Sequence, residues 1–363
     1  MPTVFFTGFP GFLGSALLPR TLKRHADEVS ATCLVQPKFM ALAQRRVNEL
    51  RRAIPSLADR IHLVEGDITR PDLGLGDASA LKRDVVEIFH LAAIYDLSVR
   101  REPAMRVNLD GTRHLLDFAA ACPGLKRFQY VSTCYVSGRY DGIFTERDLE
   151  KGQSFQNYYE ETKYLAELEV QRRMRDGLSA TVYRPAIVVG DSTIGSTQKY
   201  DGPYYLFRLI ARQGRLALVP KVGDTRRSLF NLVPSDYVVN AIAHIAGLES
   251  SRGQVFQLCD PNPLTMDEVM DAAGQALGKR LFKLPLPAGV ARVALTRTPG
   301  IARALQIPAE TIDYLTLPTR YTCENTLASL EGSGIHCPGL RDYLPQLVEF
   351  MKAHPEIGSA AMT

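Results

Sequence analysis

The 363-residue sequence predicts an α/β protein built around a doubly wound parallel sheet. From residue 4 to about 190, short apolar runs rich in β-branched residues alternate with longer stretches of helical period. A glycine-rich loop follows the first of these runs, and the alternation stops after about residue 190. Because parallel neighbours need a crossover that is normally helical, the alternation indicates helices on both faces of the sheet.

The first half of the chain is expected to hold six strands and four helices. The strands are predicted at residues 4–7, 31–35, 61–65, 85–91, 127–132 and 180–184. Between them, helices are predicted at about residues 12–25, 38–54, 102–121 and 157–176.

In the second half, the strand-helix alternation is lost, and segments that contain glycine and proline separate shorter elements. Helices are expected at about residues 203–213, 235–248, 265–277 and 340–353, and short strands at residues 229–233 and 255–258. This mixture indicates a smaller lobe that is interleaved with the last part of the sheet.

The composition is that of an ordinary globular protein, with 45% hydrophobic and 23% charged residues. The formal net charge is only +4 and basic residues are interleaved with acidic ones, so nucleic acid is not an expected partner. A dense basic stretch at residues 172–175 is typical of a solvated helix face; attraction of a phosphorylated cofactor or carrier is the alternative.

Six cysteines are scattered without a CxxC or Cys/His metal spacing, which favours a reduced cytoplasm and predicts no metal site. The first residues show no secretion signal, and no run of about 18 apolar residues predicts a transmembrane segment. A peripheral membrane contact and a homodimer both stay open.

A glycine-rich loop links the first predicted strand to the first predicted helix, and it reads Thr7-Gly8-Phe9-Pro10-Gly11-Phe12-Leu13-Gly14. Gly8 would permit a tight turn, Gly11 would let the backbone approach a pyrophosphate, and Gly14 would let the helix pack closely on the sheet. The phosphates would lie at the helix N-terminus, where unpaired N–H groups and the helix dipole favour negative charge. We therefore predict a Rossmann-type dinucleotide-binding domain at residues 1–190, to which part of residues 229–260 returns. Residues 191–363 would form mostly a substrate-binding lobe.

The end of the second predicted strand usually decides which dinucleotide binds. An acid there accepts hydrogen bonds from the ribose 2′-hydroxyl, whereas an arginine accommodates a 2′-phosphate. Here Gln36 is neutral and Lys38 is basic, and Arg45 and Arg46 follow in the predicted helix. The pattern favours NADP(H), leaves NAD(H) open, and makes Gln36 and Lys38 candidate cofactor-binding residues.

The strongest chemical signal is the pair Tyr159 and Lys163 near the start of a predicted helix. Residues four apart project from one helical face, and an ammonium beside a tyrosine would lower its pKa from the reference value of about 10. The lysine could also reach the nicotinamide ribose. A third member would be a hydroxyl from Ser132 or Thr133 at the carboxyl end of the preceding strand, where ligands of parallel sheets bind.

The order of these motifs resembles the extended short-chain dehydrogenase/reductase family. The matching segments are Thr7-Gly8-x-x-Gly11-x-x-Gly14, Gly66-Asp67-Ile68, His90-Leu91-Ala92-Ala93, Asn108-Leu109-Asp110-Gly111-Thr112, Val131-Ser132-Thr133, Tyr159-x-x-x-Lys163, Tyr183-Arg184-Pro185 and Val233-Pro234-Ser235-Asp236-Tyr237. The match covers roughly the first half of the chain and continues at the last of these segments.

The resemblance implies a role for several positions. It implies that Thr133, Tyr159 and Lys163 form the catalytic set, that Asp67 contacts adenine, and that Asn108 is mainly structural. Further positions at the cofactor site are Phe9, Phe12, Leu13, Ile68, Leu91, Ala92, Ala93, Arg184 and Pro185.

Two of the matching residues, Arg184 and His90, have an alternative structural interpretation. A structural ion pair is an equal alternative for Arg184 at the end of its predicted strand. His90 lies in a predicted buried strand and is expected to be a packed histidine rather than a base.

Within the family, residues 11–14, 33–35 and 130–133 resemble the branch of fatty acyl-CoA reductases and the thioester-reductase domains of carboxylic acid reductases. This branch implies reduction of a carbonyl or acyl thioester on an apolar, lipid-like substrate, free or carried on CoA or an acyl carrier. Hydride would come from the nicotinamide and the proton from Tyr159. Apolar stretches at residues 204–207 and 281–284 fit such a substrate and equally fit a packed helix and a buried strand.

Three other functions stay open. The first is reversible oxidation of a hydroxyl on a steroid-like or flavonoid-like molecule, and the second is a nucleotide-sugar epimerase or dehydratase. The third is a binding protein that senses the cofactor without turnover, which the presence of both Tyr159 and Lys163 disfavours. Asp201 and Tyr204 are weak candidates for the substrate pocket.

Overall fold

A computed structural model of the chain describes residues 1–25, 29–57, 59–286 and 318–358. Its centre is a seven-stranded sheet in the order β11-β7-β5-β4-β1-β2-β3, in which every pairing is parallel. The strands are β1 (Thr3–Thr7), β2 (Ser30–Val35), β3 (Ile61–Glu65), β4 (Val85–His90), β5 (Arg127–Val131), β7 (Ala180–Pro185) and β11 (Val255–Leu258). The predicted α/β fold with a doubly wound parallel sheet is confirmed.

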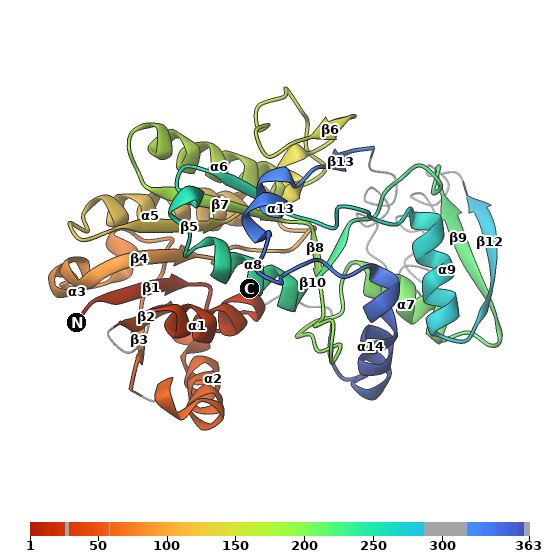
Figure 1. Cartoon of the computed structure of the whole chain (residues 1–363), viewed down its shortest axis with the longest axis horizontal. Helices are drawn as coiled ribbons and strands as arrows, with labels where there is room; N and C mark the ends of the chain where they lie inside the picture. The colour runs from red at the N-terminus through yellow and green to blue at the C-terminus, as the bar shows by residue number, and fades with distance from the viewer. Residues whose placement is uncertain (26–28, 58, 287–317, 359–363) are drawn as a thin grey trace.

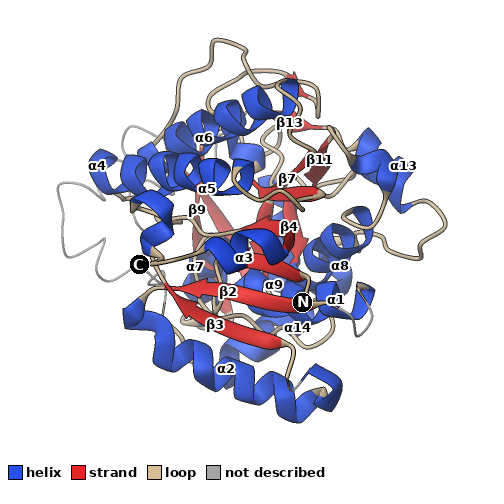
Figure 2. Cartoon of the chain, turned by 90° about the vertical axis from the view of Figure 1, so that its left-hand side faces the viewer, coloured by secondary structure: helices blue, strands red, loops and turns tan. Residues whose placement is uncertain are grey.

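Helices cover both faces of this sheet (Figure 1 and Figure 2). One face carries α1 (Phe12–Arg24), α2 (Met40–Ala53) and α8 (Ser235–Ile245). The other carries α3 (Ser79–Asp84), α5 (Gly111–Ala120) and α6 (Tyr158–Arg175).

Strand β1 shows why the strands are apolar throughout. Val4 and Phe6 lie in the core under α1 and α8, whereas Phe5 lies in the opposite core and stacks on Phe118 of α5 with ring centroids 5.1 Å apart. Successive side chains of a strand point to opposite faces, so a strand that is covered on both sides reads as a continuous apolar run.

Most of the chain after residue 190 forms a smaller lobe on the right of Figure 1. It contains α7 (Pro203–Ala211), α9 (Met266–Ala276), α14 (Leu340–Ala353) and two parallel strand pairs, β8 (Ile187–Val189) with β10 (Leu232–Pro234) and β9 (Leu216–Val222) with β12 (Arg280–Leu286). Phe207, Val269 and Leu347 belong to its own apolar core. β11 leaves this part of the chain to become the edge strand beside β7, while residues 287–317 and 359–363 of the predicted lobe lie outside the described residues.

A short C-terminal segment ties back to the sheet. It comprises β13 (Arg320–Tyr321), which pairs with β6 (Ile143–Phe144), and α13 (Glu324–Leu330). The Glu146 carboxylate accepts hydrogen bonds from the N–H groups of Asn325 at 2.6 Å and of Gln257 at 2.9 Å. One buried acid thus joins the start of α13 to β11.

Two predicted elements differ from those observed. The single helix expected at residues 102–121 is divided into α4 (Arg101–Ala104), a π-helical segment (Met105–Asp110) and α5. Within that segment, the Asn108 amide bonds the backbone of Ile94 at 2.8 and 3.2 Å and the Thr162 hydroxyl at 3.0 Å, consistent with the predicted structural role. The strand expected at residues 229–233 begins only at Leu232 and pairs with β8 rather than with the main sheet.

Candidate active site

The predicted site residues follow neighbouring strands at one edge of the sheet. Thr133 comes just after β5, Leu91 after β4, Gly8 after β1 and Gln36 after β2, and these four strands are adjacent. The strand order reverses between β4 and β1, which is where ligands bind in open parallel sheets. The fold therefore brings the predicted cofactor and catalytic residues to one place.

The glycine loop is tight at the positions where glycine was predicted to matter. Gly8 has a φ of +88°, and its carbonyl accepts a hydrogen bond from the Gly11 N–H at 2.9 Å. A Cβ on Gly14 would lie 2.5 Å from the Gly8 oxygen, so only glycine lets α1 approach this closely. The first turn of α1 has no side-chain cap and no acid, so its N–H groups suit a pyrophosphate.

The segment after β4 lies directly against this loop. A Cβ on Gly8 would be 2.7 Å from the Leu91 carbonyl carbon, and the Ala92 N–H donates to Thr7 Oγ1 at 3.3 Å. The backbone of Leu91, Ala92 and Ala93 thereby borders the space in front of the glycine loop.

The His90 side chain connects this segment to neighbouring elements by hydrogen bonds. Its Nδ1 lies 2.7 Å from Thr7 Oγ1 and its Nε2 lies 3.0 Å from Thr112 Oγ1. Burial, with a contribution from Lys163, lowers the pKa of His90 to about 3, so the imidazole is neutral at physiological pH. His90 is the packed histidine that the sequence predicted.

The other end of the site contains Gln36 and Asp67. Burial acts to raise the pKa of Asp67, but hydrogen bonds from Thr69 and Gln36 outweigh it and lower that pKa. The Thr69 N–H lies 2.8 Å from Asp67 Oδ1. The Lys38 side chain is exposed, whereas the Ile68 side chain is buried in the core.

Tyr159 and Thr133 meet at the carboxyl end of β5. Asn157 begins α6 by accepting a hydrogen bond from the Glu160 N–H at 3.0 Å, and Tyr159 follows in the first turn. Burial raises the pKa of Tyr159, and a hydrogen bond with Thr133 acts in the opposite direction. Thr133 Oγ1 also accepts from the Tyr135 N–H at 3.2 Å, which orients the hydroxyl.

Lys163 contacts groups other than Tyr159. Its ammonium donates to the Tyr130 hydroxyl at 2.9 Å and to the Val131 carbonyl at 2.8 Å. Burial lowers the pKa of Lys163 to about 7, although Glu167 acts to raise it. The prediction that Lys163 lowers the pKa of Tyr159 is wrong for these side-chain positions, because burial dominates at Tyr159 and the ammonium is held by β5.

Ser132 and Arg184 belong to a buried network around Glu167. Ser132 Oγ donates to the Glu167 carboxylate at 2.5 Å, and Arg184 donates through Nη2 at 2.6 Å and Nε at 3.0 Å. The side chains of Arg184 and Glu167 are both 0% exposed. Of the two predicted hydroxyls, Thr133 therefore remains the one that faces Tyr159, and the Arg184 side chain forms the structural ion pair instead of reaching a cofactor. Pro185 lies beside the site, with its carbonyl 3.5 Å from Thr133 Oγ1.

Three residues of the site were not singled out from the sequence: Tyr130, Glu167 and Tyr95. Glu167 could have been found, because Tyr159, Lys163 and Glu167 follow one another at four-residue spacing on α6. Tyr130 precedes Ser132 by two residues on β5, but nothing local shows that it would hold a lysine. Tyr95 packs edge-on to Tyr159 from the segment after β4, and no sequence pattern indicates this contact.

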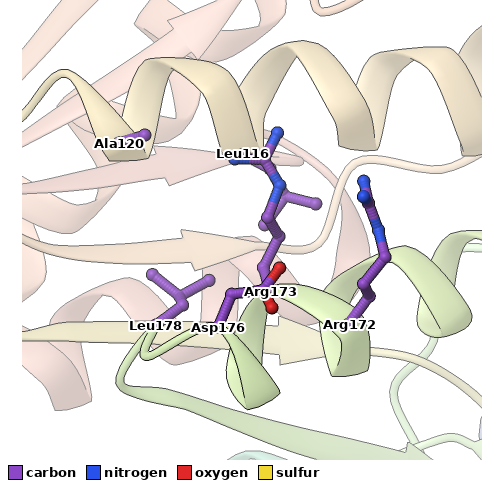
Figure 3. Close-up of a pocket in the computed structure, with 6 residues that line it drawn as sticks. All are labelled: Leu116, Ala120, Arg172, Arg173, Asp176 and Leu178. Atoms are coloured by element: carbon purple, nitrogen blue, oxygen red, sulfur yellow. The ribbon is translucent and has the colours of Figure 1, made fainter.

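A small cavity lies at the same edge of the sheet as Thr133. It is formed by the segments that follow β5 and β7, the segment before β10 and the β13 region, and its lining residues are Tyr135, Ala186, Leu229, Phe230, Asn231, Thr319 and Tyr321. A wider depression lies between α5 and α6 (Figure 3). Its Leu178 lies two residues before β7, which places the depression at the amino ends of the strands, away from the candidate site.

Basic residues at this depression are paired with acids. Arg172 lies 2.8 Å from Glu169, and Arg173 lies 2.5 Å from Asp117. This arrangement is typical of a solvated helix face, the first of the two interpretations of residues 172–175.

Tyr204 and Asp201, the two residues suggested for the substrate pocket, have different surroundings. Tyr204 is 2% exposed, accepts a hydrogen bond from the Gly190 N–H at 3.0 Å and packs within the lobe core. Asp201 pairs with Lys199 at 2.5 Å near Tyr95. Of the two, only Asp201 is therefore near Tyr95, the aromatic neighbour of Tyr159.

In the part of the chain that the structure describes, no three His, Cys, Asp or Glu side chains gather in a way that could hold a metal ion. None of the described helices has both the length and the apolar character needed to cross a bilayer.

The fold and the glycine loop define a Rossmann-type protein with a nicotinamide dinucleotide as its cofactor. The model of an NAD-binding family described as male sterility protein matches residues 6–242, and the chain belongs to this family. The family lies within the extended short-chain dehydrogenases/reductases, which are NAD(P)-dependent oxidoreductases, so the predicted family and enzyme class are confirmed.

Two of the similar proteins are named as reductases. The chain is 31% identical over 289 residues to glycine betaine reductase ATRR of Emericella nidulans, a match that covers 74% of this chain and 22% of that protein. It is 28% identical over 313 residues to fatty acyl-CoA reductase 1 of Pongo abelii, covering 73% of this chain and 59% of the relative. The chain thus spans less than two thirds of both relatives.

A solved structure extends the likeness over the whole chain. The terminal R domain from the myxalamid PKS-NRPS biosynthetic pathway superposes with a TM-score of 0.81 at 26% identity. The match covers 99% of this chain and 93% of that domain.

Proposed function

We propose that this protein uses NADPH to reduce the thioester of an apolar acyl chain, carried on CoA or an acyl carrier, to the aldehyde. The observation that carries the proposal is the proximity of the Thr133 and Tyr159 hydroxyls at the carboxyl end of β5, where Thr133 acts to lower the pKa of Tyr159. Two hydroxyls placed beside a dinucleotide site can hold and protonate a carbonyl oxygen.

The proposed reaction adds one hydride and one proton to the acyl group. A bound nicotinamide would supply the hydride. Thr133 and Tyr159 hold the carbonyl oxygen, and Tyr159 gives that oxygen its phenolic proton as the carbon becomes tetrahedral. The resulting thiohemiacetal loses its C–S bond, its hydroxyl proton passes to sulfur, and the products are an aldehyde and a thiol.

The pKa shifts at Tyr159 and Lys163 fit this direction of proton transfer. Burial raises the pKa of Tyr159, which keeps the phenol protonated until oxygen begins to carry negative charge. Lys163, with its pKa lowered to about 7, gains and loses a proton near neutral pH. Because Tyr130 and Val131 hold its ammonium, Lys163 is proposed to bind the nicotinamide ribose rather than to pass a proton directly to Tyr159.

NADPH is proposed over NADH from the end of β2. No acid follows that strand, and the Gln36 side chain instead contacts Asp67, which also holds Thr69. Lys38 is exposed beside this point and could meet a 2′-phosphate.

The thioester substrate is proposed from the relatives together with the site. The fatty acyl-CoA reductase and the R domain of a PKS-NRPS pathway are named for an acyl-CoA substrate and a biosynthetic assembly respectively. At the same edge of the sheet as Thr133, the side chains of Ala186, Leu229 and Phe230 offer apolar surface against which an acyl chain could pack.

The test compares Tyr159→Phe with its neighbour Tyr158→Phe, using NADPH and hexadecanoyl-CoA. Tyr158 is 44% exposed and lies outside the network around Thr133, so its variant should keep turnover within about twofold of the wild type. Tyr159→Phe should lose about 10²- to 10⁴-fold in kcat while NADPH binding, followed by cofactor fluorescence, is unchanged. Hexadecanoyl-CoA turnover that survives in Tyr159→Phe would refute the catalytic role, and a wild type that binds NADPH but never reduces the thioester would refute the substrate class.

A further inference from the structure

Tyr95 is the aromatic neighbour of the proposed proton donor. It lies in the segment after β4, and its ring meets the Tyr159 ring edge-on, with centroids 5.1 Å apart and planes at 83°. This is a favoured geometry for two aromatic rings, because the positive edge of one faces the negative face of the other. The Tyr95 ring covers one side of Tyr159 and limits its rotation.

Tyr95 is in turn held from the smaller lobe. The Lys199 ammonium lies 4.0 Å from the centre of the Tyr95 ring, within the range of a cation–π contact. The same ammonium is 2.5 Å from the Asp201 carboxylate, and the two side chains are only 26% and 23% exposed. We call this pair the Lys199–Asp201 clamp.

The Lys199–Asp201 clamp belongs to a segment that is held in place by the packing of Tyr200. Tyr200, between its two members, is fully buried and packs on Tyr204 of α7 with ring centroids 5.0 Å apart. The Tyr200 N–H also donates to the Gly358 carbonyl at 2.9 Å. A side chain held by such a segment can transmit the position of the lobe to the segment after β4.

We propose that Tyr95 is a positioning residue for Tyr159, and that the Lys199–Asp201 clamp holds Tyr95 against it. The inference rests on the proposed function, because it assigns Tyr159 the proton transfer. Through Tyr95, the smaller lobe fixes the angle at which the Tyr159 hydroxyl meets a substrate carbonyl and keeps water from one side of that ring. Small displacements at a reacting group can cost about 10²-fold in rate, so a ring that prevents them affects kcat more than KM.

Several neighbouring groups influence the pKa of each tyrosine. Those that act on Tyr159 are Thr133, Glu160 and Cys134. Those around Tyr95 are Lys199, Asp201, Tyr159 and Tyr205. Since burial is the largest influence on the pKa of Tyr159, admitting water where the Tyr95 ring now lies should lower that pKa toward its ordinary value.

Fluorine NMR of the protein labelled with 3-fluorotyrosine reads this pKa without any substrate. The chain has 15 tyrosines, and the resonance of Tyr159 is the one lost in Tyr159→Phe. In Tyr95→Leu that resonance should titrate about one pH unit lower than in the wild type, and in Tyr95→Phe, which keeps the ring, it should stay where it is. Tyr95→Met replaces Tyr95→Leu if the latter does not fold.

Turnover of hexadecanoyl-CoA provides the second readout. Tyr95→Leu should lower kcat about tenfold with little change in KM, and Lys199→Met about threefold. The effect of Lys199→Met should vanish in a Tyr95→Leu background, because the clamp acts only through that ring. Lys151→Met is the matched control, since Lys151 lies 5.2 Å from the Tyr140 ring and 3.2 Å from Asp148 but outside the site.

The two proposals fail in different ways. An unchanged titration of Tyr159 in Tyr95→Leu would overturn the positioning role even if Tyr159→Phe is inactive. A Lys199→Met loss that persists in the Tyr95→Leu background would overturn the clamp. If the wild type does not reduce hexadecanoyl-CoA, the proposed function fails, and the NMR titration alone decides whether Tyr95 shields Tyr159.

Discussion

Replacing Glu167 with glutamine should lower the free energy of unfolding by about 3 to 5 kcal/mol, the usual effect of removing one member of a buried ion pair. The Glu167 carboxylate accepts from Arg184 at 2.6 Å, from Ser132 at 2.5 Å and from Gln171 at 2.8 Å, and neither Glu167 nor Arg184 is exposed. The amide would leave the guanidinium without a counter-charge in the core and would turn an N–H donor toward other donors.

Urea unfolding followed by far-UV circular dichroism measures this effect, since the sequence contains no tryptophan. With a slope of about 3 kcal/mol per M, the midpoint should fall by about 1 to 1.7 M. Glu49→Gln is the control: the Arg46–Glu49 pair is 38% and 57% exposed, so its loss should cost less than about 0.5 kcal/mol.

A double variant separates a buried charge from lost packing. Glu167→Leu combined with Arg184→Met leaves neither charge in the core and should be more stable than Glu167→Leu alone. A loss below about 1 kcal/mol in Glu167→Gln would refute the reasoning, because the buried guanidinium would then tolerate the absence of its partner.

Three further outcomes are expected. Gly14→Ala should abolish NADPH binding in a fluorescence titration, because its Cβ would lie 2.5 Å from the Gly8 oxygen; binding within about twofold of the wild type would contradict the loop geometry. The pKa of Lys163, about 7 when folded and 10.5 when unfolded, means that the unfolded chain binds more protons between these pH values. Stability from this group should therefore rise with pH above 7, by about 2 kcal/mol up to pH 9, and Lys163→Met should remove that rise in urea unfolding at the two pH values. Gln36→Asp should weaken NADPH relative to NADH by about tenfold or more in steady-state kinetics, and an unchanged ratio would show that the end of β2 does not select the cofactor.

Features set by local spacing could be predicted from the sequence. The strand-helix alternation indicated the parallel sheet, and the spacing of Gly8, Gly11 and Gly14 indicated the turn and the approach of α1, because a tight turn and a close helix leave no room for a Cβ. The four-residue spacing of Tyr159 and Lys163 likewise placed both on one side of α6.

Contacts between distant segments were not predictable in this way. Ser132 and Thr133 are adjacent residues with hydroxyl side chains at the end of one strand. The Ser132 hydroxyl donates to Glu167, which is 35 residues further along the chain, whereas the Thr133 hydroxyl interacts with Tyr159. The ion pair of Arg184 with Glu167 and the contact of Lys163 with Tyr130 could not be predicted either, because each joins a strand to helix α6.

The sequence by itself therefore determined the family, the fold class and the chemical groups that the candidate site contains. The tertiary structure decided which of those groups face one another and which are used in the core. It also added Tyr95 and Lys199, which lie on separate segments and meet beside Tyr159. The physical reason is that helical and strand periodicity describes neighbours within an element, whereas burial and the partners of a charge depend on which elements pack together.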